Sequence, residues 1–155
     1  MVSILSVGGA IASGTFVVLT TLLILTEIVG RRLFNWSTLI EDEYSGYLTV
    51  AIGFFGLAYT LKTEGHVRVN VLISRLSPGK SKRLDGFCSL IACAFISYFA
   101  WCSFELVWTS LSNLTISPTP TETPIFIPQL PIFLGLLLFA IALFARGIAN
   151  IIGET

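Results

Sequence analysis

Residues 1–26 have the sequence MVSILSVGGAIASGTFVVLTTLLILT, which contains no Asp, Glu, Lys or Arg. A helix needs about 20 apolar residues to cross the hydrocarbon core of a bilayer, so this stretch is long enough to span a membrane. A cleaved signal peptide is the alternative. No Lys or Arg precedes the apolar part, however, and that part is longer than in a typical signal sequence. We therefore expect a retained transmembrane helix.

Three further stretches share this character. Residues 44–61 and 123–145 carry no charge, and residues 86–111 carry only Glu105. Backbone groups in a bilayer must be satisfied internally, which favours helices, and the ten-residue alternation of barrel strands is absent. The sequence predicts an all-α integral membrane protein, one four-helix domain over residues 1–155. The expected spans are residues 4–27, 43–62, 86–112 and 130–150, the last starting near Pro131.

The overall composition agrees with a membrane protein. Hydrophobic residues make up 54% of the chain and charged residues 12%, with a mean hydropathy of +0.87. A soluble domain carries about 25% charged residues. Nine basic residues balance nine acidic ones, so no net charge attracts nucleic acid. A soluble enzyme and a DNA-binding module are both excluded.

The distribution of basic residues predicts the orientation. The loop of residues 62–85 holds six of the nine Lys and Arg residues, whereas the first loop holds Arg31 and Arg32 and residues 113–122 hold none. Basic loops stay in the cytoplasm. We therefore expect loop 62–85 and both termini to be cytoplasmic.

Two loops contain segments expected to lie at the membrane surface. Val69, Leu72, Ile73 and Leu76 recur with helical spacing, which predicts a short amphipathic interfacial helix. Leu33, Trp36 and Ile40 suggest a weaker interfacial segment in the first loop. The basic residues expected to contact lipid headgroups are Arg68, Arg75, Lys80, Lys82 and Arg83.

Residues for catalysis or metal binding are scarce. The chain has one histidine, His66, and its three cysteines, Cys88, Cys93 and Cys102, lie within one apolar span without a C-x-x-C pair. No G-x-S-x-G, H-E-x-x-H or P-loop pattern is present. The sequence predicts no enzyme, no catalytic residue, no cofactor and no metal.

Ionisable residues inside a span are costly unless they are paired or hydrated. Glu105 is either a proton or cation carrier or an ion-pair partner near the outer end of its helix, and its depth favours the second role. Glu27 lies four residues before Arg31, so an ion pair within the helix is available. We expect both carboxylates to be structural.

Two surfaces are candidates for subunit contacts. Small residues let helices approach closely in lipid, and one stripe of the second span carries Gly46, Thr49, Gly53 and Gly56. Contact within the chain and contact with another subunit remain equally open for this stripe. Trp101 and Trp108 share a face of the third span and face either lipid or a partner helix.

Three segments carry a family resemblance: residues 43–50 (EYSGYLTV), 54–58 (FFGLA) and 62–70 (KTEGHVRVN). Their order and spacing closely resemble the DctQ-like small membrane subunit of tripartite ATP-independent periplasmic (TRAP) transporters. That family has an acidic pair before a Tyr- and Leu-rich helix, then Phe-x-Gly-x-Ala, then Glu-Gly-His. Asp42 takes the first acidic position here, and Asn70 stands where the family has Asp. The resemblance covers about residues 31–78.

The resemblance implies a stable heterodimer with a large membrane subunit that carries the substrate and sodium sites and works as an elevator. It also implies a transient partner, a periplasmic protein that delivers an organic acid for sodium symport. The small subunit would be part of the fixed scaffold in the bacterial inner membrane, in contact with its lipids. Arg31, Glu43 and His66 would fix its fold or its seat on the partner.

Two other functions remain open. One is a homodimeric four-helix drug/proton antiporter, which needs a mid-membrane carboxylate and balanced loop charges. Glu27 at the end of its helix and the strongly basic central loop argue against it. The other is a membrane anchor subunit without a transport role.

Overall fold

The computed structural model describes residues 2–35, 40–63 and 78–152. These ranges form four helices: α1 (Val2–Phe34), α2 (Glu41–Lys62), α4 (Pro78–Ser112) and α5 (Phe126–Ile152). Each is long and apolar enough to cross a membrane. Across the described ranges there is no strand, only an isolated bridge between Ile116 and Pro124. The predicted all-α membrane fold is confirmed.

The interfacial helix expected over residues 69–76 lies outside the described residues. The weaker segment in the first loop is not a separate helix where it is described, because α1 continues through Leu33 to Phe34 and Ile40 directly precedes α2. Trp36 lies outside the described residues. The apolar side chain of Leu33 therefore belongs to the last turn of a transmembrane helix.

Each helix contains one expected span and extends beyond it. The largest difference is in α4, which begins at Pro78, eight residues before the apolar part of the sequence begins at Gly86. Helix α5 also begins earlier than expected, at Phe126, so that Pro131 lies inside it. Pro131 has no N–H to donate to the carbonyl of Ile127. One missing bond near the start of a 27-residue helix does not end it.

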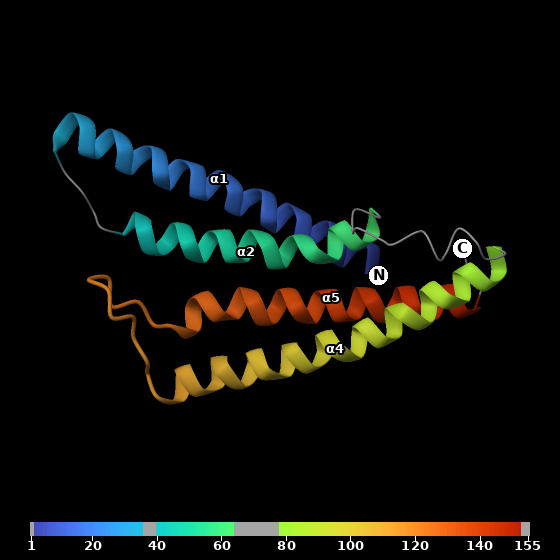
Figure 1. Ribbon diagram of the computed structural model, residues 1–155. Coiled ribbons are helices and arrows are strands. Elements are labelled where there is room, and N and C mark those ends of the chain that lie inside the picture. Colours follow the sequence, from blue (N-terminus) through green and yellow to red (C-terminus); the bar gives the residue numbers. More distant parts are fainter. Residues whose placement is uncertain (1, 36–39, 64–77, 153–155) are drawn as a thin grey trace.

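The helices lie in a row and not in a square bundle. Helix α4 packs along α5, α5 along α2, and α2 along α1, with a smaller contact between α1 and α5. Figure 1 shows α1 and α2 close together near the N-terminus of the chain and diverging towards the C-terminal end of α1. The N-terminus of α1 and the C-terminus of α5 lie at the same end, here called the termini end.

Glycines set the distances between neighbouring helices. A Cβ atom built on Gly135 of α5 would lie 2.6 Å from Cβ of Phe54 in α2, and one on Gly9 of α1 would lie 2.6 Å from the Phe55 carbonyl oxygen. Gly147 of α5 faces the Gly86 carbonyl of α4 in the same way, at 3.2 Å. Small residues are the usual means of close packing in lipid, where water does not drive helices together.

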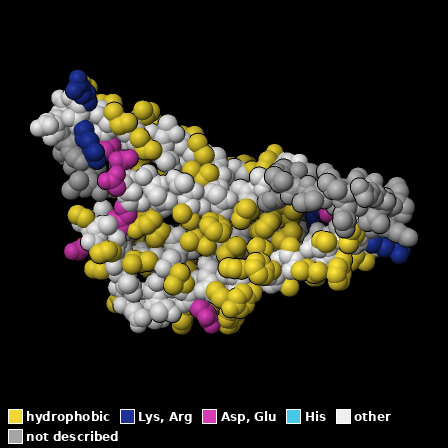
Figure 2. Space-filling view, viewed as in Figure 1, with side chains coloured by type: hydrophobic (Ala, Val, Ile, Leu, Met, Phe, Trp, Pro, Cys, Tyr) yellow, Lys and Arg dark blue, Asp and Glu magenta, His cyan; other side chains and the backbone are white. Residues whose placement is uncertain are grey.

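Most large apolar side chains lie on the outside. The buried cluster consists of Ala58, Leu61, Ala142 and Leu143, from α2 and α5. Figure 2 shows apolar side chains over the broad face of the molecule and charged side chains mainly towards its two ends. This distribution suits a protein whose faces meet lipid or other membrane helices.

Candidate functional site

The termini end holds a polar cluster that joins three helices. The Arg146 guanidinium of α5 donates from Nε to Oδ2 of Asp85 in α4 at 3.2 Å and from Nη1 to the Leu61 carbonyl of α2 at 3.1 Å. Asn150 donates to the same Asp85 oxygen at 2.6 Å. The Asp85 and Arg146 side chains are 21% and 18% exposed. Partial burial makes these bonds stronger than those of a surface ion pair.

The sequence did not single out this cluster. The sequence feature that could have revealed it is the position of two opposite charges. Asp85 lies immediately before the third apolar stretch, and Arg146 lies near the end of the fourth. In an antiparallel pair of spans these two positions lie at the same membrane level. Only the packing of α5 between α2 and α4 brings the third participant, the Leu61 carbonyl, within reach of Arg146.

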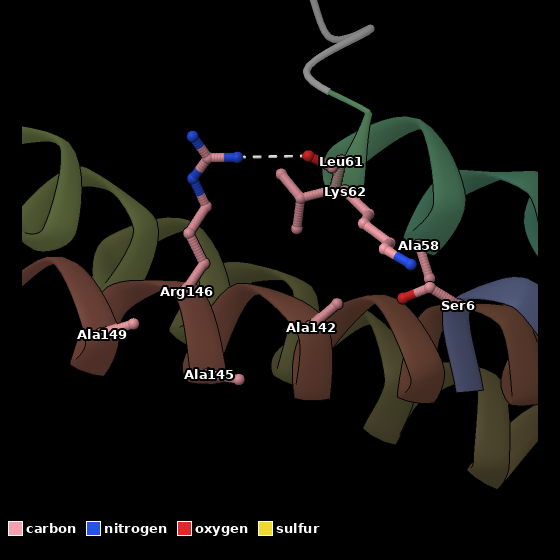
Figure 3. A pocket seen from close by; sticks show the side chains of 8 residues that line it. All are labelled: Ser6, Ala58, Leu61, Lys62, Ala142, Ala145, Arg146 and Ala149. Carbon is pink, nitrogen blue, oxygen red and sulfur yellow. Dashed lines mark hydrogen bonds between the residues drawn. The ribbon is translucent and has the colours of Figure 1, made fainter. Parts of the chain in front are cut away.

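A pocket of about 270 Å³ adjoins this cluster. Figure 3 shows its lining side chains, which come from α1, α2 and α5, with Lys62 and Arg146 on either side of Leu61. The remaining lining residues are Ser6, Ala58, Ala142, Ala145 and Ala149. The pocket lies at the termini end because Lys62 is the last residue of α2.

The opposite end is organised around Glu43, in the first turn of α2. Its carboxylate accepts hydrogen bonds from the Thr119 and Thr121 hydroxyls of the loop between α4 and α5 and from the Tyr47 hydroxyl one turn along α2. Thr123 adds a bond to the Tyr44 hydroxyl at 3.2 Å. The acidic position of the motif thus ties the second helix to a loop 76 residues further on.

The loop at this end has a defined backbone. Thr115 and Ser117 pair with Ile125 and Thr123 through backbone bonds of 3.0 and 2.8 Å. A turn closes between them, in which the Glu122 amide donates to the Thr119 carbonyl at 3.0 Å and Glu122 has a positive φ of 45°. The two threonine hydroxyls are therefore presented to Glu43 by a short antiparallel turn.

Helix α1 carries its charged residues at this same end. Arg31 donates from Nε to Oε1 of Glu27 at 2.9 Å, the pair within one helix that the sequence made available. Its Nη2 also lies 3.7 Å from the Glu41 carboxylate at the start of α2. Glu27 is only 5% exposed, so its charge is buried together with a partner. The pair lies in the last two turns of α1, which ends at Phe34.

The ion pair expected for Glu105 stays a prediction, because its partner can belong to this chain or to another subunit. In the described part of the chain its carboxylate accepts a hydrogen bond from the Trp101 indole at 3.0 Å, and no cation lies within ion-pair distance. The reason is the row arrangement: α4 is at its edge, so the face that carries Glu105 has no neighbouring helix. Trp101 and Trp108 lie on the outside of this helix, each 61% exposed.

The glycine stripe of α2 divides into two parts. Gly56 faces α1, since a Cβ atom there would lie 3.6 Å from the Ser13 hydroxyl, and Ser13 donates to the Ile52 carbonyl at 2.9 Å. Gly46 and Gly53 have nothing within 4 Å of that position. Gly53 lies in an open groove of about 390 Å³.

The basic residues predicted to meet lipid are only partly described. Lys82 and Arg83 are exposed in the first turns of α4, which also contains Lys80. His66, Arg68 and Arg75 lie outside the described residues. The two exposed side chains are at the termini end, the same end as Lys62 and Arg146.

Polar clusters at both ends and apolar faces between them define a multi-pass membrane protein. A family model for the DctQ component of tripartite ATP-independent periplasmic transporters matches residues 20–152, and the chain belongs to this family. A protein of Haemophilus influenzae, named as a candidate TRAP transporter small permease protein, is 32% identical over 91 residues. The match covers 57% of this chain and 56% of that relative, so the chain spans about half of its length.

This family membership confirms the resemblance seen in the sequence. The family comprises transporter permease subunits, which are not a class of enzyme. The matched range contains Glu43, Asp85, Thr119 and Arg146, the residues that organise the two ends.

Proposed function

We propose that this chain is the small permease subunit of a TRAP transporter for sodium-coupled uptake of an organic acid. It forms a stable heterodimer with a large elevator-type membrane subunit, to which a periplasmic binding protein delivers the substrate. The chain itself enlarges the fixed scaffold of the complex in the inner membrane. The observation that carries the proposal is the family match over residues 20–152.

The arrangement of the helices supports a scaffold role. A row of helices leaves two broad apolar faces open to lipid or to a partner, whereas a closed bundle hides apolar surface inside. Polar tethers hold both ends of the row, through Arg146 at one end and Glu43 at the other. A part that stays fixed while a partner moves needs this combination of apolar contact area and internal rigidity.

Among the described residues, three surfaces of the row are candidates for contact with the large subunit. The first is the groove of α2 around Gly53, together with Gly46. The second is the aromatic face of α4 with Trp101 and Trp108, because aromatic residues are enriched at interface cores. The third is the C-terminal half of α1, where this helix diverges from α2 (Figure 1). Of these we propose the Gly53 groove as the seat, because a helix can approach its backbone most closely there.

The proposed orientation places the termini end in the cytoplasm. It follows from the six basic residues of loop 62–85. The exposed Lys82 and Arg83 at that end would then face the anionic inner leaflet.

The first experiment is purification of the tagged chain from native membranes in mild detergent, followed by mass spectrometry of what accompanies it. The proposal predicts one much larger, many-spanning membrane protein at equal stoichiometry. Sodium-driven uptake of an organic acid into proteoliposomes should then require both proteins and the binding protein. Recovery of a homodimer would favour an antiporter, and uptake that survives loss of this chain would indicate an anchor.

Replacement of an open glycine tests the seat on the partner. Gly53→Leu fills the groove of α2 and should abolish co-purification of the large subunit. Gly14→Leu is the matched control, since Gly14 of α1 also has nothing within 4 Å of its Cβ position. Equal recovery of the partner with both variants would move the interface away from this groove.

A further inference from the structure

Three oxygen atoms lie in mutual contact at the start of α2, and we call them the oxygen triangle. They are Oε2 of Glu43 and the hydroxyl oxygens of Thr119 and Thr121. Both hydroxyls contact Oε2, and the two hydroxyl oxygens lie 2.8 Å from each other. Figure 1 shows the loop between α4 and α5, which carries both threonines, beside the first turn of α2.

The oxygen triangle has too few protons for its three contacts. A hydroxyl group carries one proton, and an ionised carboxylate carries none. If Thr119 and Thr121 both donate to Glu43, no proton lies between the two hydroxyl oxygens. If one threonine donates to the other instead, its own contact with the carboxylate has no proton. In either case two oxygen lone pairs face each other at hydrogen-bond distance, which is repulsive unless a positive charge lies beside them.

The hydroxyls around the triangle do not supply the missing proton. Ser117 lies 2.9 Å from the Thr119 hydroxyl, Thr123 lies 3.1 Å from the Thr121 hydroxyl, and Tyr47 donates to the other carboxylate oxygen. Each of these contacts needs a proton of its own, and none runs along an edge of the triangle. These three hydroxyls instead surround the triangle with further oxygen atoms. Ser117 and Thr123 are 7% and 3% exposed, so this oxygen-rich shell is held inside the turn.

Basic side chains do not provide the positive charge in the part of the chain that the structure describes. Arg31 lies at this end of the molecule, but it pairs with Glu27 and Glu41. Within the described ranges no Lys or Arg lies within ion-pair distance of Glu43. Glu41 and Asp42 precede it in the same turn of α2 and add negative potential. A small cation beside the triangle is therefore favoured electrostatically.

From these observations we propose that Glu43, Thr119 and Thr121 bind a sodium ion through the oxygen triangle. Both hydroxyl protons still point to Glu43, while the lone pairs that face each other bind the ion. Oxygen ligands suit hard cations, and the affinity of calcium sites rises with the number of charged ligands. The described residues contain no group of three His, Cys, Asp or Glu side chains that could hold a metal. One carboxylate with neutral hydroxyls thus favours a monovalent ion, and the short edges of the triangle favour Na⁺ over the larger K⁺.

Thermal unfolding of the full chain in detergent tests the proposal. The Tm is measured in NaCl, KCl and choline chloride at equal ionic strength and about pH 8, where a carboxyl group is ionised. An ion that binds only the folded chain raises the folding equilibrium constant about tenfold at ten times its dissociation constant. The Tm should therefore be higher in NaCl than in choline chloride by about 3–6 °C. Equal Tm values in NaCl and choline chloride would overturn the proposal, as would an equal rise in KCl.

Two valine variants of the same loop locate the ion. Thr121→Val removes one oxygen of the triangle at nearly constant side-chain shape, and the difference between NaCl and choline chloride should disappear. Thr115→Val is the matched control, because Thr115 is exposed in this loop and lies outside the triangle. It should keep the full difference. The readout is the response to sodium, so a lower Tm of either variant does not affect it. A response that survives in Thr121→Val would overturn the site.

Hydrogen exchange of the parent chain gives a second measurement that needs no variant. Sodium should slow exchange in residues 113–125, because the ion ties this loop to α2, and should leave exchange in the middle of α5 unchanged. Equal exchange of the loop in NaCl and choline chloride would overturn the proposal. Both measurements use the chain without the large subunit and without transport. Their results are therefore separate from that of the proposed function.

Discussion

Replacement of Gly135 by alanine should separate α2 from α5. The new Cβ atom would lie 2.6 Å from Cβ of Phe54 and 2.7 Å from both its carbonyl carbon and its carbonyl oxygen. Carbon atoms in van der Waals contact are about 3.5–4.0 Å apart, so the helices must move by about 1 Å. Two of the three contacted atoms belong to the backbone, and a rotamer change of Phe54 cannot relieve the clash.

The expected loss of stability follows from two opposing terms. Overpacking of this kind costs about 1–3 kcal/mol. The change from glycine to alanine stabilises a helix by up to about 1 kcal/mol. The clash with backbone atoms places the cost of overpacking in the upper part of its range. The net loss is then about 1–2 kcal/mol. For a chain of this size it corresponds to a fall in Tm of about 2–8 °C.

Gly53→Ala provides the matched control, because Gly53 has nothing within 4 Å of its Cβ position and also lies inside a transmembrane helix. At Gly53 the new methyl group meets no neighbouring atom, so the higher helix propensity of alanine is the remaining effect. The Tm should rise by about 2–4 °C. The assay is thermal unfolding of the full chain in detergent, followed by far-UV circular dichroism. A Gly135→Ala variant as stable as Gly53→Ala would refute the close packing of α2 on α5.

Three further outcomes are expected from the polar residues. Asp85→Asn should lower the free energy of unfolding by about 2 kcal/mol, since a charged acceptor of two hydrogen bonds is lost. In a double-mutant cycle with Arg146→Gln, measured by the same thermal assay, the two effects on the free energy of unfolding should be less than additive by about 1 kcal/mol. Glu43→Gln should speed hydrogen exchange in residues 113–125 and leave exchange in α5 unchanged, because Glu43 holds that loop through Thr119; equal rates in both proteins would contradict this tether. Glu105→Gln should unfold at the same temperature as the parent chain, since the amide oxygen still accepts from the indole, and a clear loss would reveal an ion pair.

Much of the fold followed from local sequence. Four uncharged or nearly uncharged stretches identified four helices, because a helix satisfies the polar backbone groups within each segment and the alternation of barrel strands is absent. The helix ends were harder to place. Helix α4 continues to Pro78 through Lys82 and Arg83, since a helix that leaves the hydrocarbon no longer needs apolar side chains. In α5 the sequence favoured a start near Pro131, but the helix begins at Phe126 and tolerates the proline.

For the candidate residues, too, contacts within one helix were predicted and contacts between distant segments were not. Glu27 and Arg31 were paired correctly because they are four residues apart on one helix. For Glu105 an ion pair stays a prediction: its carboxylate lies on an edge helix and accepts a hydrogen bond from the Trp101 indole. The partners of Glu43 were missed altogether, since Thr119 is 76 residues away and an ordinary threonine in sequence.

The sequence by itself determined the membrane class, the number of long helices among the described residues and the family, because each depends on composition or on short motifs read along the chain. Tertiary structure alone decided the row order α4, α5, α2, α1 and the residues joined at each end. The physical reason is that helix neighbours in lipid are selected by close packing at small residues, such as Gly135 against Phe54. The hydropathy of a span depends on its own residues alone, so it carries no information about which helix the span packs against.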